Sequence, residues 1–351
     1  MQKEKGGTFL PLDAHIVCSA AVVGKKEHDG PLGEYFDMFD ESGEDKFGRK
    51  TWEMAESEMQ RTALNLALVK GHLKETDIGA LFAGDLLNQC VGAAYGLMNF
   101  PSAYFGLYGA CSTFAEGMIL GAICAAHGAF ERCAVVASSH FCAAERQYRT
   151  PVEYGGQRPP TAQWTVTGAG AAVIARGAGE VTIAGVLPGT VVEMGIKDVG
   201  NMGAAMAPAA LDTLLRYFRA TDTRPEDFDL IMTGDLGHEG SAILSDLLGV
   251  EGYAPGAVLN DGGMMIYNRE TQDTHAGGSG CGCSAAVMSS YVIPRLESGA
   301  LRRVLFLGTG AMMSPDSLKQ GQSIPAVAHL VELRHGGIRT ADIKMHKTQE
   351  I

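Results

Sequence analysis

Cys111 is the residue best placed for covalent chemistry in this chain of 351 residues. It stands in the segment Gly109-Ala110-Cys111-Ser112-Thr113, between a short strand-like run and a helix of small residues. The dipole at a helix N-terminus favours the thiolate, which is the nucleophilic form of cysteine. The same position suits an anion held by backbone N–H groups, or a thiol that only fills the core. Three roles are therefore open for Cys111: nucleophile, ligand contact and core thiol.

The other cysteines favour a reduced interior. Cys18, Cys124 and Cys133 lie inside apolar runs, which is typical of core thiols and not of a secreted disulfide framework. Cys283 follows Gly280 at a second expected helix start and could add anion-binding N–H groups. The pattern is too sparse for zinc, and the glycine-rich runs lack the context of a dinucleotide site. We therefore expect no metal site and no cofactor.

Side chains that could hold a carboxylate follow the strand-like run 132–138, namely His140, Arg146, Arg149 and Arg158. Open α/β sheets bind ligands beyond the carboxyl ends of their strands, and a guanidinium matches a carboxylate bidentately. Each residue also has a structural alternative. His140 could simply be hydrogen-bonded at a strand end, and Arg146 could form a salt bridge with Glu145 or Glu153.

Asp85 and Asp235 occupy matching places, each after a glycine at the end of a strand-like run. Such residues often cap the following helix or fix a turn. Asp85 could alternatively hold calcium or orient His140. Neither belongs to a D-x-D-x-D-G loop, so the sequence does not predict a dedicated calcium site.

The bulk composition excludes several classes of protein. Hydrophobic residues make up 46% and charged residues 19%, which permits a large core. The net charge of −12 argues against a nucleic-acid binder, and an anionic ligand would need a local cationic pocket. The N-terminus has no apolar segment typical of a signal peptide, and no run of about 18 apolar residues is long enough to cross a membrane. We therefore expect a soluble chain without a signal peptide.

Strand-like and helix-like segments alternate along the first half. Strands are expected at 15–23, 77–84, 102–108 and 132–138, with a helix after Thr51 through residue 70 and another at 112–127. This alternation predicts an α/β fold with mostly parallel strands.

The second half repeats the first. DIGALFAGDL at 77–86 matches DFDLIMTGDL at 227–236, and the segment 109–139 matches 280–310. Two blocks in the same order indicate a duplication. A pseudo-two-fold axis would bring Cys111 close to the loop that holds Cys281 and Cys283. We place the halves at 1–178 and 179–332, followed by a flexible C-terminal tail at 333–351.

A duplicated α/β chain with this turn at Cys111 resembles the thiolase and ketosynthase superfamily. Longer strings, including KEHDGPLGEYFD (26–37) and AERQYRTPVEYGGQRP (144–159), resemble the stage V sporulation protein AD family over about residues 15 to 330. The resemblance implies a thiolase-like fold, with two duplicated halves in a five-layered αβαβα arrangement.

The superfamily also implies what the catalytic partners of Cys111 should be. The cysteine carries the acyl group there, and a histidine plus a second histidine or asparagine share the proton and hold the oxyanion. The resemblance implies that one partner follows the strand ending at Gly234 and that the other stands at the helix start after Gly280. Here Asp235 stands at the first position and Cys281-Gly282-Cys283 at the second. His238, three positions after Asp235, would depart from the pattern. We therefore expect no catalysis, with an acyltransferase that uses Cys111 as nucleophile as the alternative.

The sporulation family implies a role in moving dipicolinic acid, free or as its calcium chelate, through the inner forespore or spore membrane. Its members are peripheral on that membrane and work beside membrane subunits, and the superfamily forms homodimers through the strand here at 102–108. The ligand contacts expected on this basis are Cys111, His140, Arg146, Asp85, Arg149 and Cys283. A scaffold that docks membrane subunits and binds no small molecule is a third possibility.

Overall fold

The structure is a computed structural model that describes residues 8–148, 158–177 and 179–336. Its strands form two groups of five. The first group is β1 (Leu10–Val23), β3 (Ala80–Gly84), β4 (Ala103–Leu107), β5 (Arg132–Ser139) and β7 (Gly168–Ala175). The second group is β8 (Val181–Leu187), β9 (Leu230–Thr233), β10 (Leu259–Asp261), β12 (Arg303–Ala311) and β13 (Ala326–His335). Short strands are β2 (Met38–Phe39), β6 (Trp164–Thr165) and β11 (Gly278–Ser279).

The two groups have the same strand order. The first runs β4-β3-β5-β7-β1 and the second runs β10-β9-β12-β13-β8, and they join where β1 pairs with β8. The repeated strings lie at equivalent places in this order, since DIGALFAGDL contains β3 and DFDLIMTGDL contains β9. The duplication predicted from the sequence is therefore visible in the topology.

The sheets are mixed but mostly parallel, as predicted: four strands of each group run in one direction, and only β7 in the first group and β13 in the second run against them. β3 pairs in parallel with β4 and β5, but β7 runs antiparallel to both β5 and β1. The second group repeats this arrangement around β9 and β13. β7 and β8 follow each other without a helix between them, and both pair antiparallel with β1, one on each side of it.

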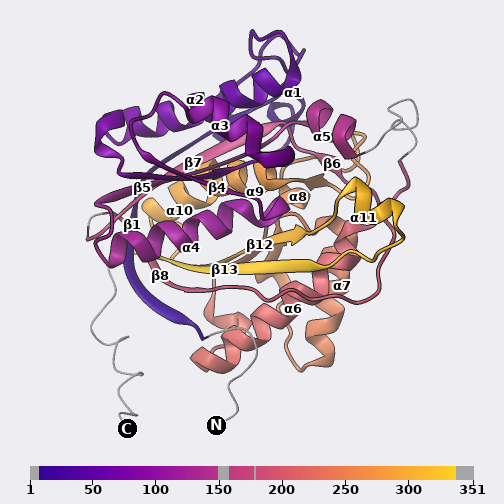
Figure 1. Cartoon of the computed structure of the whole chain (residues 1–351). Coiled ribbons are helices and arrows are strands. Elements are labelled where there is room, and N and C mark those ends of the chain that lie inside the picture. The colour runs from indigo at the N-terminus through magenta and orange to yellow at the C-terminus, as the bar shows by residue number, and fades with distance from the viewer. Residues whose placement is uncertain (1–7, 149–157, 178, 337–351) are drawn as a thin grey trace.

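Helices complete five layers, which Figure 1 shows from top to bottom. The outer helices are α2 (Trp52–Lys70) and α3 (Val91–Leu97) on the first sheet, and α6 (Met202–Thr221) and α7 (Gly237–Val250) on the second. Between the sheets lie α4 (Thr113–Ala126), α9 (Cys281–Val287) and α10 (Ile293–Glu297). Shorter helices are α1 (Lys25–His28), α5 (Phe141–Tyr148), α8 (Gly262–Met265) and α11 (Pro315–Lys319). The predicted αβαβα arrangement is confirmed.

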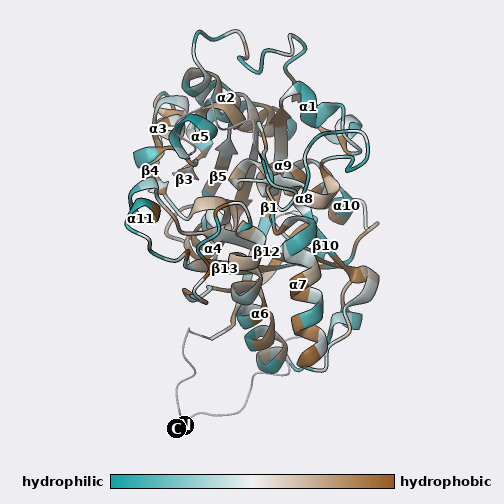
Figure 2. Ribbon diagram, turned by 90° about the vertical axis from the view of Figure 1, so that its right-hand side faces the viewer, coloured by the Kyte–Doolittle hydropathy of each residue, from teal (hydrophilic) through white to brown (hydrophobic). Residues whose placement is uncertain are grey.

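Local sequence explains the position of the layers. Thr51 caps α2 by accepting a hydrogen bond from the Met54 backbone N–H at 3.3 Å, as predicted. The small residues of α4 are buried along most of its length because it has a sheet on each side. Figure 2 shows the hydrophobic colour concentrated on the inner strands and on helix faces that pack against them.

The predicted tail begins within the second sheet. β13 continues through Leu333, Arg334 and His335, and the buried Leu333 pairs with Val304 of β12. The remainder of the predicted tail, from residue 337, lies outside the described residues. Within the described ranges, no helix is long and apolar enough to cross a membrane.

Candidate functional site

Cys111 lies where the two halves meet, in a 3₁₀ turn between β4 and α4. Ala110 holds this turn with φ of 51°, a left-handed conformation that is uncommon for a residue with a side chain. Glycines of β12 let the second half approach closely. A Cβ atom at Gly310 would lie 2.6 Å from the Gly109 carbonyl oxygen, and one at Gly308 would lie 2.5 Å from the Ala115 Cβ. The turn is thus fixed by packing from the other half.

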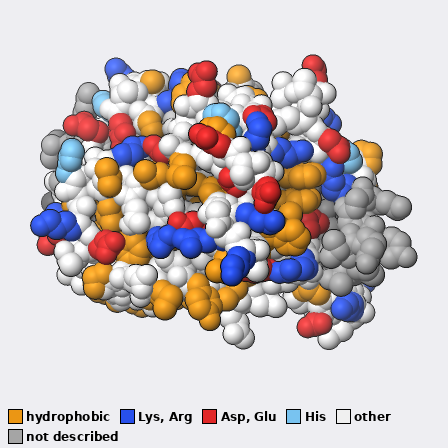
Figure 3. Space-filling model, turned by 90° about the horizontal axis from the view of Figure 1, so that it is seen from above, with side chains coloured by type: hydrophobic (Ala, Val, Ile, Leu, Met, Phe, Trp, Pro, Cys, Tyr) orange, Lys and Arg blue, Asp and Glu red, His pale blue; other side chains and the backbone are white. Residues whose placement is uncertain are grey.

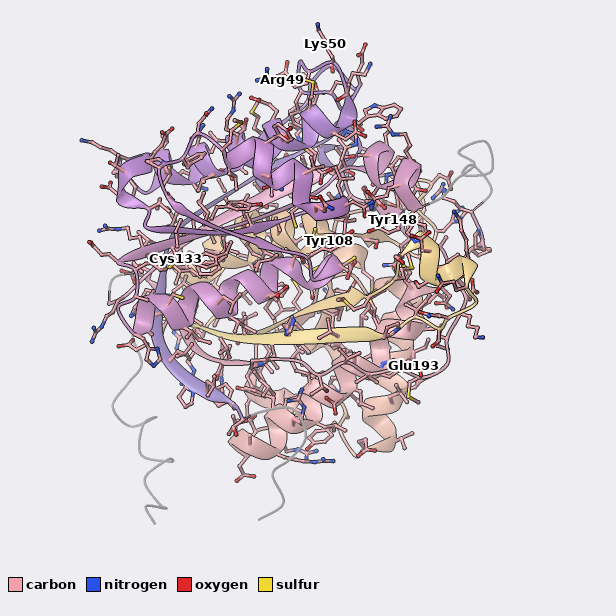
Figure 4. All side chains as sticks on the ribbon, viewed as in Figure 1. Arg49, Lys50, Tyr108, Cys133, Tyr148 and Glu193 are labelled. Carbon is pink, nitrogen blue, oxygen red and sulfur yellow. The ribbon has the colours of Figure 1, made fainter. Side chains whose placement is uncertain are left out.

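The buried Cys111 borders a pocket of about 70 Å³, called the Cys111 pocket below. Its walls are mainly apolar and come from both halves, and its residues are Leu86, Ala110, Cys111, Ala144, Glu145, Tyr148, Thr165, Val199, Met202, Ser279, Ala311, Met313 and Leu318. Within the described part of the chain, no lysine, arginine or histidine lines it. The hydroxyls of Tyr108 and Tyr148, which Figure 4 labels, lie 3.4 Å apart.

Asp235 occupies the buried space beside the Cys111 thiol. Its carboxylate accepts hydrogen bonds from the Gly280 N–H at 2.8 Å, the Thr309 hydroxyl at 2.9 Å and the Ser279 hydroxyl at 3.2 Å. The Ser279 hydroxyl lies 4.0 Å from the Cys111 sulfur. The predicted proximity of Cys111 and the 277–283 loop is therefore observed. The carboxylate stands at a position where the sequence resemblance implied a histidine or an asparagine.

The electrostatics of this group favour a neutral thiol. Burial raises the pKa of Cys111 well above its usual value, and the negative charge of Asp235 raises this pKa further. Burial also raises the pKa of Asp235 to about 6, so the carboxyl is mainly ionised at pH 7.5 and mainly protonated at pH 5. The helix dipole that favours a thiolate is worth at most about 2 kcal/mol, and here burial and a like charge oppose it.

Comparison with known proteins places the chain in a family. The family profile of stage V sporulation protein AD (SpoVAD) matches residues 7–334. The chain belongs to the stage V sporulation protein AD family. It is 43% identical over 320 residues to stage V sporulation protein AD of Bacillus subtilis (strain 168), covering 91% of this chain and 94% of that protein.

Solved structures support the fold of this stage V sporulation protein AD family member. Cerulenin-bound OleA of Xanthomonas campestris matches with a TM-score of 0.59 at 16% identity, over 93% of this chain and 97% of OleA. A second OleA structure matches with a TM-score of 0.58 at 16% identity, over 94% and 100% of the two chains. The fold is therefore thiolase-like, as the sequence resemblance implied.

Asp85 has the structural role that the sequence analysis weighed for it. It accepts hydrogen bonds from the Leu87 N–H at 2.8 Å and the Ala93 N–H at 2.7 Å, which hold the loop after β3 and the start of α3. Its second-half counterpart by contacts is not Asp235 but Asp261, which accepts from the backbone N–H groups of residues 236, 237 and 264. Asp261 therefore caps the start of α7, the role that the sequence position of Asp235 had suggested for Asp235.

The predicted cationic contacts do not gather at Cys111. The His140 ring is buried and its Nε2 lies 2.7 Å from the Asp45 carbonyl oxygen, away from the pocket lining. Arg146 lies on the exposed face of α5, where it pairs with Glu53 and stacks over Trp52 at 5.4 Å. Arg146 therefore does not line the Cys111 pocket, where we expected it to contact the ligand. On α5 the Ala144 side chain faces this pocket, and the Arg146 side chain faces outward. Arg149 lies outside the described residues.

The cysteines of the second half are buried near the site without bordering the pocket. The Cys283 sulfur lies 3.7 Å from the Gly234 carbonyl oxygen, and the Cys281 thiol donates to the Ser138 carbonyl at 2.8 Å. Burial raises the pKa of both thiols. His238 contributes its backbone N–H to the Ala276 carbonyl, and its ring is not part of the pocket lining.

Sequence reasoning missed the hydroxyl donors Ser279, Thr309 and Tyr148, and the carboxyl of Glu145. Tyr148 stands in AERQYRTPVEYGGQRP, the string that resembles the family, and Ser279 stands in the glycine-rich run GGSG at 277–280, and these were the signals available for them. In the described residues, no group of three or more histidine, cysteine or acidic side chains is arranged to hold a metal ion.

Proposed function

We propose that the chain binds dipicolinate, free or as its calcium chelate, in the Cys111 pocket without transferring an acyl group. It would do so as a peripheral homodimer beside the membrane subunits of a spore-membrane assembly for dipicolinate uptake or release. The family supports the sporulation role, since the chain matches stage V sporulation protein AD over almost its whole length. The observation that carries the proposal is the buried Asp235 beside Cys111.

Asp235 argues against nucleophilic catalysis for two reasons. A nucleophilic cysteine needs a group that stabilises its thiolate, as a neighbouring imidazolium does. The charge of Asp235 does the opposite, because it raises the pKa of Cys111. An oxyanion also needs a hydrogen-bond donor, and an ionised carboxylate can only accept.

At about 70 Å³ the pocket is smaller than the usual small-molecule site of about 300–1,000 Å³, so it would have to widen to admit a pyridine dicarboxylate. Its apolar walls can contact a ring, and a few hydroxyl and thiol groups can orient polar atoms, which is the usual composition of a small-molecule site. The donors are Thr165, Tyr148 and Ser279, and no described lysine or arginine adds to them. An anion here would therefore depend on neutral donors and on the protonation of Asp235.

The test is calorimetric titration of dipicolinate into the wild type and two variants of α5. Ala144→Phe places a ring in the pocket and is expected to remove the binding heat. Arg146→Ala changes the outward face two residues away and should leave the affinity within about twofold. Circular dichroism would show that both variants fold. Equal affinity in Ala144→Phe and the wild type would reject the Cys111 pocket as the site.

The alternative is an acyltransferase with Cys111 as nucleophile. The thiolase-like fold and the thiol at the start of α4 favour it. It would require the Cys111 thiol to ionise beside Asp235, and an acyl-coenzyme A substrate would then leave a covalent adduct on Cys111.

A further inference from the structure

Trp164 of β6 carries an unusual set of neighbours. The Phe141 ring stacks on it with centroids 3.8 Å apart and planes 6° from parallel, so one face of the indole is covered. The Lys26 ammonium lies 4.0 Å from the indole centroid, and the Arg158 guanidinium carbon lies 4.6 Å from it. Two cations therefore gather at the face that Phe141 leaves open.

These two cations are incompletely balanced. Lys26 forms no ion pair with any described residue. The Arg158 side chain is only 7% exposed, its Nη2 donates to the Asp273 carboxylate at 2.8 Å, and its buried Nη1 has no hydrogen-bond partner. Burial lowers the pKa of Lys26 and the charge of Arg158 lowers it further, while the carboxylates of Glu27, Asp273 and Asp45 oppose this shift in part. Two neighbouring like charges with an unused donor indicate a missing anion.

Lys26 borders a hollow, and Asp273, the partner of Arg158, lies on the wall of the same hollow. This hollow of about 560 Å³ is lined by Lys25, Lys26, Asp29, Gly43, Asp45, Thr271, Gln272 and Asp273. Lys25 is paired with Asp29 at 2.8 Å, and Asp273 is shared between Arg158 and His275. The Asp45 carboxylate accepts from the Lys25 backbone N–H at 3.3 Å. Lys26 Nζ and Arg158 Nη1 thus have no hydrogen-bond or ion-pair partner among the described residues, although the carboxylates of Glu27, Asp273 and Asp45 act on Lys26 from a distance.

We propose that Lys26 and Arg158 hold a phosphate-type oxyanion between Nζ and Nη1, at a site separate from the Cys111 pocket. The Asp273 contact already uses one side of the guanidinium fork, which disfavours a bidentate carboxylate. Two donors from different side chains suit a tetrahedral group with several acceptor oxygens. The phosphate could be free in solution or part of a lipid headgroup.

The first test measures binding of inorganic phosphate. The chain has two tryptophans, so Trp52→Phe leaves Trp164 as the only indole reporter. Titration with phosphate, at ionic strength matched by sodium chloride, is expected to give a saturable fluorescence change. Lys26→Gln and Arg158→Gln should each weaken the apparent affinity at least tenfold. Lys25→Gln, which removes a lysine already paired with Asp29, should stay within twofold.

A response that sodium chloride reproduces, or one unchanged in Lys26→Gln, would overturn the proposal. Lys26→Gln decides the matter even if Arg158→Gln does not fold, because Lys26 is half-exposed and makes no ion pair with the described residues. Cosedimentation with phosphatidylcholine vesicles, with and without phosphatidylglycerol, distinguishes the source. Binding to the anionic vesicles that needs Lys26 and is displaced by phosphate indicates a headgroup. Phosphate binding without vesicle binding indicates the free ion.

Discussion

At the scale of single residues, the chemistry of the site depends on which group faces the Cys111 sulfur. A buried carboxylate that accepts hydrogen bonds from Ser279, Gly280 and Thr309 is held firmly in place. It cannot stabilise a thiolate, but it changes its own charge near pH 6 because burial raises its pKa to about 6. The pocket of this protein is therefore sensitive to pH through Asp235 and not through its cysteine.

This property predicts how the affinity for dipicolinate varies with pH. Asp235 repels an anion when ionised, so affinity should rise by about fivefold from pH 7.5 to pH 5, corresponding to roughly 1 kcal/mol of charge repulsion. Calorimetric titration at the two pH values measures this. The affinity of Asp235→Asn should rise much less over this pH range, because its side chain is neutral at both pH values. Any rise that remains in this variant measures the effect of protonating the ligand itself. An affinity that rises equally in both proteins would contradict the role of Asp235.

Glu27 of α1 provides a second residue-level prediction, on stability. It is buried, accepts hydrogen bonds from the Tyr267 hydroxyl and the Thr167 N–H, and has one oxygen without a partner. Burial raises its pKa from 4.5 to about 7. The folded state therefore holds this proton more tightly than the unfolded state, and the stabilisation is lost as pH rises from about 4.5 to about 7.

Urea unfolding at pH 5 and pH 7.5 tests this assignment. Glu27→Gln is expected to reduce the loss of unfolding free energy between these pH values by about 2 kcal/mol relative to the wild type. The exposed Glu34→Gln is the matched control and should keep the wild-type dependence. An identical pH dependence in Glu27→Gln and the wild type would show that Glu27 is not the group responsible.

At the scale of elements, β4 is the strand that most needs a partner. It forms one end of the sheet path, and its Tyr104 and Phe105 side chains are 41% and 43% exposed. An apolar edge strand of this kind promotes pairing with another chain. Tyr95 and Met98, at the end of α3, are also exposed. The view onto the outer helices in Figure 3 shows hydrophobic side chains set among charged ones.

The exposed edge predicts a homodimer that pairs β4 with its symmetry copy. Tyr104→Lys would bring like charges together across the two-fold axis and is expected to shift the protein toward monomer. Size-exclusion chromatography with light scattering measures the mass. Val250→Lys makes the same kind of change at the exposed end of α7 and should leave the dimer intact. A monomeric wild type, or a dimeric Tyr104→Lys, would count against this interface.

At the scale of the whole molecule, the duplication made most of the fold predictable. Matching strings located β3, β9 and the helices after Gly109 and Gly280, and symmetry then brought Cys111 close to the 277–283 loop. The single antiparallel strand of each group, β7 or β13, was not predicted, because each follows a short helix, α5 or α11, and still pairs antiparallel with the long strand before that helix.

The candidate site was predictable only in part. Cys111 could be predicted from its turn before a helix, whereas the missing histidine at Asp235 could be noticed only through the resemblance to the thiolase superfamily. The outward direction of Arg146 could not, since it depends on which face of α5 packs inward. The bond between His140 and the Asp45 carbonyl joins residues 95 positions apart, so no local pattern indicates it.

We expect this thiolase-like pocket to bind its ligand without a reactive thiolate. Incubation with a labelled acyl-coenzyme A at pH 7.5, followed by intact-mass measurement, tests this expectation most directly. We predict an unmodified wild-type mass, since burial and Asp235 both raise the pKa of Cys111. A covalent acyl adduct that disappears in Cys111→Ser would contradict the account and establish an acyltransferase.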